Sequence, residues 1–204
     1  MAIEQIDTGF SNFSYILYCN KTKKAALVDP SYNADKALEF IKSNGLTLEF
    51  IINTHHHSDH TGDNQTVKNR TGAKIIASEE DGRYIGGVDK TVIDNDEIML
   101  GEVKLKFLLT PGHTHGGICI IVDNEAIITG DTLFIGNCGR CDLPGGNYKL
   151  MFNTLQTKIK NLPDHLIVYP GHNYGDKPFD TLGNQKKTNK TLVVETLEEF
   201  SKIP

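Results

Sequence analysis

The sequence predicts an α/β or α+β domain with mixed sheets, and two observations support that prediction. Short apolar runs typical of strands dominate the first half of the chain, and segments with helical spacing are interspersed among them. The chain has 204 residues, enough for a domain with a sizeable core. We therefore expect a single domain over residues 1–204.

The first expected elements are two strands and a helix. The strands are Tyr15–Cys19 and Ala25–Asp29, and the turn-forming sequence Asn-Lys-Thr-Lys joins them as a hairpin. Asn33 is expected to cap a helix that runs to Ser43, because Asn at this position can accept a hydrogen bond from a free backbone N–H. Gly45 suits the position just after that helix.

In the rest of the chain, further predicted strands are interspersed with predicted helices. The further strands that the apolar pattern predicts are Phe50–Ile52, Lys74–Ala77, Val103–Leu109, Ile118–Val122, Ala126–Thr129 and Leu166–Tyr169. The further helices that it predicts are Asp63–Thr71, Asn147–Asn161 and Val194–Lys202.

Charge and composition exclude several classes of protein. The formal net charge of −5 argues against a nucleic-acid-binding protein with a broad basic surface. No stretch approaches the ~20 apolar residues of a membrane span, and the first residues lack the pattern of a secretory signal. Four cysteines are too few for a disulfide scaffold at this length. We expect a cytoplasmic protein that binds neither nucleic acid nor membrane.

The segment His-His-His-Ser-Asp-His at residues 55–60 is the strongest chemical feature of the chain. It follows an apolar strand directly, is internal, and is interleaved with Ser and Asp, unlike a purification tag. His55 and His57 are expected to share a side because alternate residues project the same way, whereas His56 should point away. Imidazole and carboxylate ligands of this type suit Zn²⁺, and Fe²⁺ or Mn²⁺ are admissible.

Three more candidate ligands have the same context. His113, Asp131 and His172 each follow an apolar strand and a glycine. A lone His or Asp after a strand is usually an ordinary turn residue. Four strand ends of this kind in one chain instead predict that the ligands gather at one edge of the sheets.

This pattern resembles the signature of the metallo-β-lactamase superfamily, His-x-His-x-Asp-His followed by a distant His, Asp and His. All seven positions are present and in order: His55, His57, Asp59, His60, His113, Asp131 and His172. The resemblance covers nearly the whole chain. It implies an αββα sandwich, in which two mixed β-sheets pack face to face between helices and the site lies at one edge.

The resemblance also implies two metal ions, most often zinc. His55, His57 and His113 would hold one ion, Asp59, His60 and His172 the second, and Asp131 would bridge both. Two ions about 3.5–4 Å apart can clamp a hydroxide nucleophile and polarise a carbonyl. Asp59 would then be both a ligand and the catalytic residue that orients the hydroxide.

Within the superfamily, the chain is most similar to the glyoxalase II branch. The features that carry this similarity are the loop Gly130–Phe134, the sequence Cys138-Gly139-Arg140 and Tyr174. The branch hydrolyses S-hydroxyacyl-glutathione, a small-molecule thioester. The resemblance implies that Arg140 contacts the glutathione part and that Tyr174 lies near the thiol-bearing half.

Two departures leave an alternative open. The stretch after His172 is too short for the helical C-terminal domain usual in glyoxalase II, and Cys138–Asp142 also resembles the loop of persulfide dioxygenases. Those sister enzymes would use one Fe²⁺, here held by His113, Asp131 and one histidine of the first pair. A third hypothesis, a non-catalytic metal-binding module, is opposed by the complete ligand set.

The remaining His, Cys and Asp residues have less specific interpretations. Cys138 and Cys141 form a C-x-x-C, but no second C-x-x-C follows, so an ordinary loop is favoured over a zinc or redox site. Cys19 and Cys119 are expected in the core. No ligand role is expected for His56, His115 or His165, and the resemblance implies that Asp29 supports the metal-binding loop.

Overall fold

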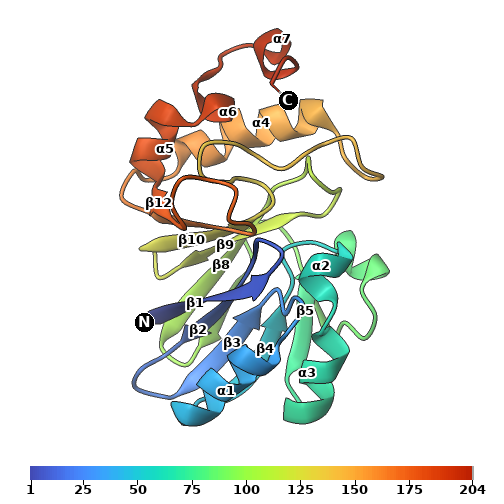
Figure 1. The fold of residues 1–204 in the computed structure, drawn as a ribbon, viewed down its shortest axis with the longest axis vertical. Coiled ribbons are helices and arrows are strands. Elements are labelled where there is room, and N and C mark those ends of the chain that lie inside the picture. Colours follow the sequence, from blue (N-terminus) through green and yellow to red (C-terminus); the bar gives the residue numbers. More distant parts are fainter. Residues whose placement is uncertain (204) are drawn as a thin grey trace.

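Two six-stranded sheets pack face to face, and helices cover the outer face of each (Figure 1). The structure is a computed structural model and describes residues 1–203. In Figure 1 the helices of the C-terminal part lie over the second sheet, and α1 and α3 lie over the first. The four layers are helices, sheet, sheet and helices, so the predicted αββα sandwich is confirmed.

The first sheet has the strand order β1-β2-β3-β4-β5-β6. The strands are β1 (Ala2–Gly9), β2 (Asn12–Tyr18), β3 (Lys24–Val28), β4 (Thr47–Ile52), β5 (Lys74–Ser78) and β6 (Lys90–Val92). β1, β2 and β3 pair antiparallel, whereas β3 to β6 pair parallel, so the sheet is mixed.

The second sheet has the order β12-β11-β10-β9-β8-β7 and is also mixed. Its strands are β7 (Glu97–Leu100), β8 (Val103–Leu109), β9 (Ile118–Val122), β10 (Ala126–Gly130), β11 (Ile167–Pro170) and β12 (Asp180–Thr181). Only β10 and β11 pair parallel in it. The long connection between them contains α4.

The helices are short. They are α1 (Asp35–Ser43), α2 (Ser58–Thr61), α3 (Asn64–Thr71), α4 (Tyr148–Thr157), α5 (Leu182–Thr188), α6 (Lys190–Val193) and α7 (Leu197–Phe200). Two 3₁₀ turns, Asp81–Tyr84 and Ile159–Asn161, complete the set. Among residues 1–203, no helix is long and apolar enough to cross a membrane.

The central strands contain short continuous apolar runs because these positions are buried on both faces. Ile16 and Leu17 are neighbours in β2 and both are fully buried, but Leu17 packs between the sheets and Ile16 packs towards α1. Ile51 and Ile52 in β4 divide in the same way. This two-sided burial explains why the strand positions could be predicted from short apolar runs.

Two predicted helix termini are wrong. Asn33 does not cap α1: its φ is +69°, and the helix begins after Ala34, whose backbone N–H donates to Asp63 Oδ2 at 2.9 Å. The expected helix Val194–Lys202 is reduced to the single turn α7, where Thr196 and Glu199 form a capping box. The strand β1 was not expected, because its residues are mostly half-buried and do not form an apolar run.

Candidate metal centre

All seven predicted ligands lie in segments that follow strands at one edge of the sandwich. His55 and His57 follow β4, Asp59 and His60 lie in α2 directly after them, and His113 follows β8. Asp131 follows β10 and His172 follows β11. The structure therefore brings the predicted ligands together at one site, from both sheets.

The first triad of possible ligands consists of His55, His57 and His113. One ring nitrogen of each lies within 4.8 Å of the others. His113 Nε2 is 2.9 Å from His57 Nδ1, and the rings of His55 and His57 meet edge to face. As expected, the ring of His56 turns away from this group, and its Nδ1 lies 3.0 Å from Asp81 Oδ2.

The second triad consists of Asp59, His60 and His172, whose possible ligand atoms also lie within 4.8 Å of one another. Asp59 Oδ2 is 3.5 Å from His60 Nε2 and 3.4 Å from His172 Nε2. The two Nε2 atoms are 3.2 Å apart. Both histidines are buried, whereas the Asp59 side chain is 36% exposed.

The Asp131 carboxylate lies between the two triads. Its Oδ2 is 3.5 Å from His113 Nε2 and 3.3 Å from His172 Nε2, and its Oδ1 is 3.4 Å from His60 Nε2. Gly171 allows this position, because a Cβ there would stand only 2.3 Å from Asp131 Oδ1. One carboxylate therefore faces ligands of both triads.

The donor atoms fit a pair of divalent metal ions. His55 Nε2 and Asp131 Oδ1 are buried and have no hydrogen-bond partner within residues 1–203. Buried polar atoms are nearly always paired, so these two point to a missing partner in the cluster. A set of imidazoles and carboxylates matches the preferences of Zn²⁺, Fe²⁺ and Mn²⁺.

The protonation states of the first triad suit metal binding. Burial lowers the pKa of His55 well below its usual value, and burial with His113 nearby lowers the pKa of His57 to about 4. Burial alone would raise the pKa of Asp131, but the surrounding imidazoles, His60 first, outweigh it and lower that pKa. Neutral imidazoles and an ionised carboxylate are the forms that bind metal.

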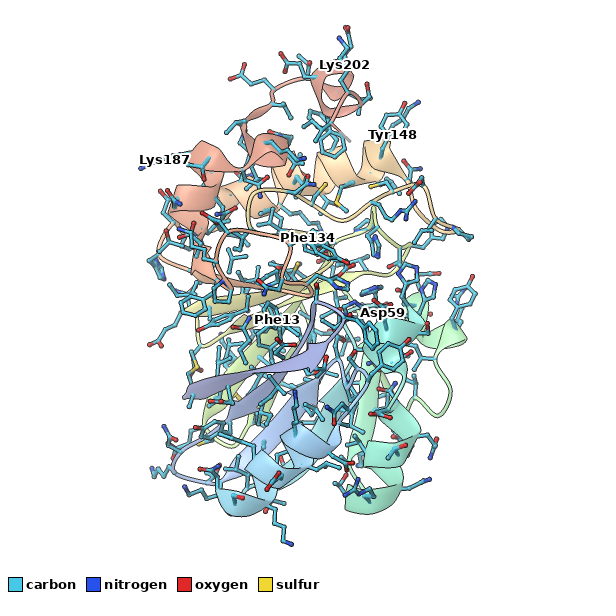
Figure 2. All side chains as sticks on the ribbon, in the orientation of Figure 1. Phe13, Asp59, Phe134, Tyr148, Lys187 and Lys202 are labelled. Atoms are coloured by element: carbon cyan, nitrogen blue, oxygen red, sulfur yellow. The ribbon has the colours of Figure 1, made fainter. Side chains whose placement is uncertain are left out.

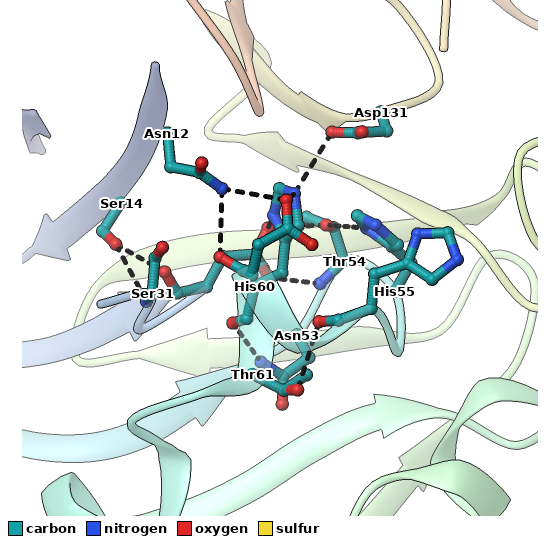
Figure 3. Close-up of polar contacts among 12 residues, drawn as sticks. Asn12, Ser14, Ser31, Asn53, Thr54, His55, His60, Thr61 and Asp131 are labelled. Atoms are coloured by element: carbon teal, nitrogen blue, oxygen red, sulfur yellow. Dashed lines mark hydrogen bonds and ion pairs between the residues drawn. The ribbon is translucent and has the colours of Figure 1, made fainter. Parts of the chain in front are cut away.

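His60 is held differently, by Asp29. Its Nδ1 lies 3.1 Å from Asp29 Oδ2. Its Nε2 faces Asp131 (Figure 3) and, at 3.2 Å, His172 Nε2. Burial lowers the pKa of His60, but Asp131 and Asp29 outweigh it and raise that pKa to about 9. Metal uptake at the second triad must therefore release a proton at neutral pH.

Asp29 also holds the loop that carries His55, as the sequence predicted. Thr54 donates to it from its backbone N–H at 2.7 Å and from its hydroxyl at 2.6 Å. The carboxylate is 2% exposed, so these bonds are shielded from water. A buried carboxylate with three donors fixes both the loop and the ring of His60.

Sequence reasoning missed two residues that contact the ligand loops. Asp81 accepts hydrogen bonds from the backbone N–H of His56, the hydroxyl of Thr114 and the backbone N–H of Gly116, and so ties the two loops together. Asn12 donates to Asp59 from across the site. Neither residue has a local motif that could have identified it.

Five of the seven candidate ligands, all except His55 and His60, line a cavity of about 1240 Å³. Asp59, Phe134 and Tyr148, all labelled in Figure 2, line it. Lys190 from α6 also faces the cavity and is exposed. The cavity is therefore large enough for a small molecule that reaches beyond the metal ligands.

Both residues expected to bind substrate line this cavity. The ring of Tyr174 stacks on His172 at 4.7 Å with an interplanar angle of 4°, and burial raises the pKa of its phenol. Arg140 carries an exposed side chain that pairs with Asp142 through two nitrogens, at 2.6 and 2.7 Å. Its backbone carbonyl accepts a hydrogen bond from His113 Nδ1 at 2.7 Å.

The two cysteines of the C-x-x-C are protonated thiols at neutral pH. Burial raises the pKa of Cys138 to about 11 and that of Cys141 to about 12, so neither is a thiolate at neutral pH. Cys19 and Cys119 are in the core, as expected. His115 and His165 are exposed, and His165 pairs with the Asn124 carbonyl rather than with the site.

Known proteins are similar to this chain in both sequence and fold. The family model of the metallo-beta-lactamase superfamily matches residues 7–172. A hydroxyacylglutathione hydrolase of Rhodospirillum rubrum is 38% identical over 173 residues, which are 84% of this chain and 66% of that protein. One from Pelagibacter ubique is 34% identical over 202 residues, 98% of this chain and 83% of that protein.

Among solved structures, ETHE1 from Myxococcus xanthus has a TM-score of 0.90 and 28% identity, and the match covers 100% of this chain and 92% of that one. The chain spans about two thirds of the length of the Rhodospirillum relative. The range matched by the family includes all seven candidate ligands.

Proposed function

The chain belongs to the metallo-β-lactamase superfamily, and from that premise we propose that it is a dinuclear metal-dependent hydrolase of thioesters. The substrate we propose is of the S-hydroxyacyl-glutathione type, in line with the names of the curated relatives. The observation that carries the proposal is the pair of complete triads that share Asp131 on the floor of a cavity.

We propose that His55, His57 and His113 hold one ion, that Asp59, His60 and His172 hold the other, and that Asp131 binds both. Zinc is the ion we expect. When bound, such a pair supplies a nucleophile from water at neutral pH and polarises the thioester carbonyl.

Other residues of the chain would bind and orient the substrate. The half-exposed carboxylate of Asp59 can accept a hydrogen bond from a water molecule in the cavity and orient it. The phenol of Tyr174 stays protonated at neutral pH and can donate a hydrogen bond to the thiol-bearing half. Phe134 meets the ring of Tyr174 edge to face and makes this wall apolar.

Metal content measured together with activity tests the proposal. We expect two divalent ions per chain and hydrolysis of S-lactoylglutathione. One Fe per chain, with O₂ uptake on glutathione persulfide and no thioester hydrolysis, would show that the proposal is wrong. It would support the second candidate function, a mononuclear iron persulfide dioxygenase.

Two observations favour that second candidate. The backbone of the chain matches ETHE1 over its whole length. The loop Cys138–Asp142 is similar in sequence to the corresponding loop of persulfide dioxygenases. His113 and Asp131 would then hold the single Fe²⁺ with one histidine of the first pair. The second complete triad favours the dinuclear hydrolase over it.

A cytoplasmic location and a single domain over residues 1–204 belong to the same proposal. The four cysteines are free, which fits a reducing compartment. The C-terminal helices pack their apolar side chains, such as Leu182, Leu192 and Phe200, against the second sheet, which fits one domain.

Replacing Lys190 by Gln is expected to weaken the binding of a thioester whose thiol half carries a carboxylate. Arg140 is engaged by Asp142, so Lys190 is the cation of the outer cavity that remains for such a carboxylate. An exposed ion pair contributes up to about 1 kcal/mol, so KM should rise roughly 5-fold while kcat is unchanged. Steady-state kinetics on S-lactoylglutathione would measure both constants.

Two controls accompany this measurement. Lys187→Gln removes a lysine on α5 that lies away from Tyr148 and the cavity (Figure 2) and should leave KM unchanged. A neutral thioester should be insensitive to Lys190→Gln. Equal effects of the two substitutions on KM would contradict a role for Lys190 in binding.

A further inference from the structure

The side chain of Asn12 is placed against one ligand of the second triad. Its Nδ2 donates to the backbone carbonyl of Asp59 at 3.0 Å and to Asp59 Oδ2 at 3.2 Å. Oδ2 is the same oxygen that faces the Nε2 atoms of His60 and His172. Asn12 is 2% exposed, so water does not compete for its amide.

The backbone of Asn12 is paired with another ligand of the same triad. Asn12 and His172 form an isolated antiparallel bridge. Two backbone hydrogen bonds flank this bridge: Phe13 N–H donates to the Gly171 carbonyl, and Asn173 N–H donates to the Ser11 carbonyl. One residue at the start of β2 therefore contacts two of the three ligands of the second triad.

The two triads differ in how firmly their ligands are held. The first consists of three histidines, two of them buried, on loops that Asp29 and Asp81 hold. The second depends on Asp59, whose side chain is 36% exposed. A free carboxylate of this exposure can rotate towards solvent.

We propose that Asn12 is a positioning residue that sets the affinity of the second metal site by orienting the Asp59 carboxylate. This inference rests on the two-ion part of the proposed function. A carboxylate oxygen has more than one lone pair, so Oδ2 can accept from Asn12 and still bind an ion. Without the amide donor, binding the second ion must also order the Asp59 side chain, and its affinity falls.

Stepwise metal binding by calorimetry tests the proposal without reference to catalysis. Metal-free wild type, Asn12→Leu and Asn12→Ala would be titrated with Zn²⁺. We expect the Kd of the tighter ion to stay within about 3-fold and that of the weaker ion to rise about 10–100-fold in both variants. The alanine variant introduces no bulk, so it covers the case in which leucine prevents folding.

Thr8→Val is the matched control. Thr8 is buried in the same hairpin and its hydroxyl donates to the Asn12 carbonyl at 3.1 Å, so the variant disturbs the hairpin but keeps the amide donor. It should bind both ions as wild type does.

The outcomes separate this inference from the proposed function. Two ions bound with unchanged affinities in both Asn12 variants would overturn the inference alone. An equal loss of affinity at both sites would mean that Asn12 is only structural, and would also overturn it. A wild type that binds a single ion would overturn the two-ion proposal and this inference with it.

Discussion

Asp131→Asn is expected to abolish the shared metal site and to lower kcat about 1000-fold or more. The carboxylate approaches His113 and His172 with one oxygen and His60 with the other, so both proposed metal ions lose a ligand at once. A bound metal contributes several kcal/mol to catalysis, and about 4 kcal/mol corresponds to roughly 1000-fold in rate. Metal analysis and kcat on S-lactoylglutathione would be measured on the same preparation.

The control for this substitution is Asp164→Asn. Asp164 is exposed and pairs with Lys186, and neither residue lines the cavity, so the amide variant should keep its metal and its activity. The melting temperature gives a second readout, because an ion that binds only the folded chain stabilises it. A variant at Asp131 that keeps two ions and wild-type kcat would show that the bridging assignment is wrong.

The clustering of the candidate ligands could be predicted from sequence because each of them has a local signal. His55 to His60 are close in the chain, and His113, Asp131 and His172 each follow an apolar strand. Strands buried on both faces produce short apolar runs that are easily recognised, as in β4. Ligands that follow such strands must then meet at the sheet edge.

The residues that hold those ligands could not be predicted in the same way. Asn12 acts on Asp59 across 47 positions, and Asp81 acts on His56 across 25. Neither contact has a spacing that secondary structure would reveal. The start of α1 was predicted wrongly for the same reason. Asp63, 29 positions away in the sequence, accepts the hydrogen bond of the Ala34 N–H, so Asn33 is not needed as a cap.

Asp29 was found from sequence only as a support for the loop, but the structure gives it a second task. It accepts from Thr54 twice and from His60 Nδ1, and the latter contact keeps Nε2 of His60 free of a proton when metal is bound. The two tasks can be separated, because an amide at this position can still accept from the Thr54 backbone.

Asp29→Asn is therefore expected to destabilise the metal-free protein by about 3 kcal/mol and to weaken the second metal site about 10–100-fold. The amide has no negative charge to pair with buried, protonated His60, and its NH₂ group opposes Nδ1–H. Urea unfolding in the presence of a chelator would measure the free energy of unfolding, and calorimetry with Zn²⁺ would measure the affinities. Asp81→Asn is the comparison, since Asp81 is equally buried and also holds ligand loops but does not contact His60.

The loss of stability in Asp29→Asn should depend on pH, and the protonation of His60 sets the direction of this dependence. Its pKa is raised to about 9 in the folded chain, above the ordinary value of about 6.5. Protonated His60 is stabilised by Asp131 and by Asp29, and this contribution to stability is complete below about pH 6.5 and is lost as pH rises through about 9. The gap in free energy of unfolding between wild type and Asp29→Asn should accordingly be larger at low pH than above pH 9, whereas a loss that is equal at both would mean that Asp29 acts through Thr54 alone.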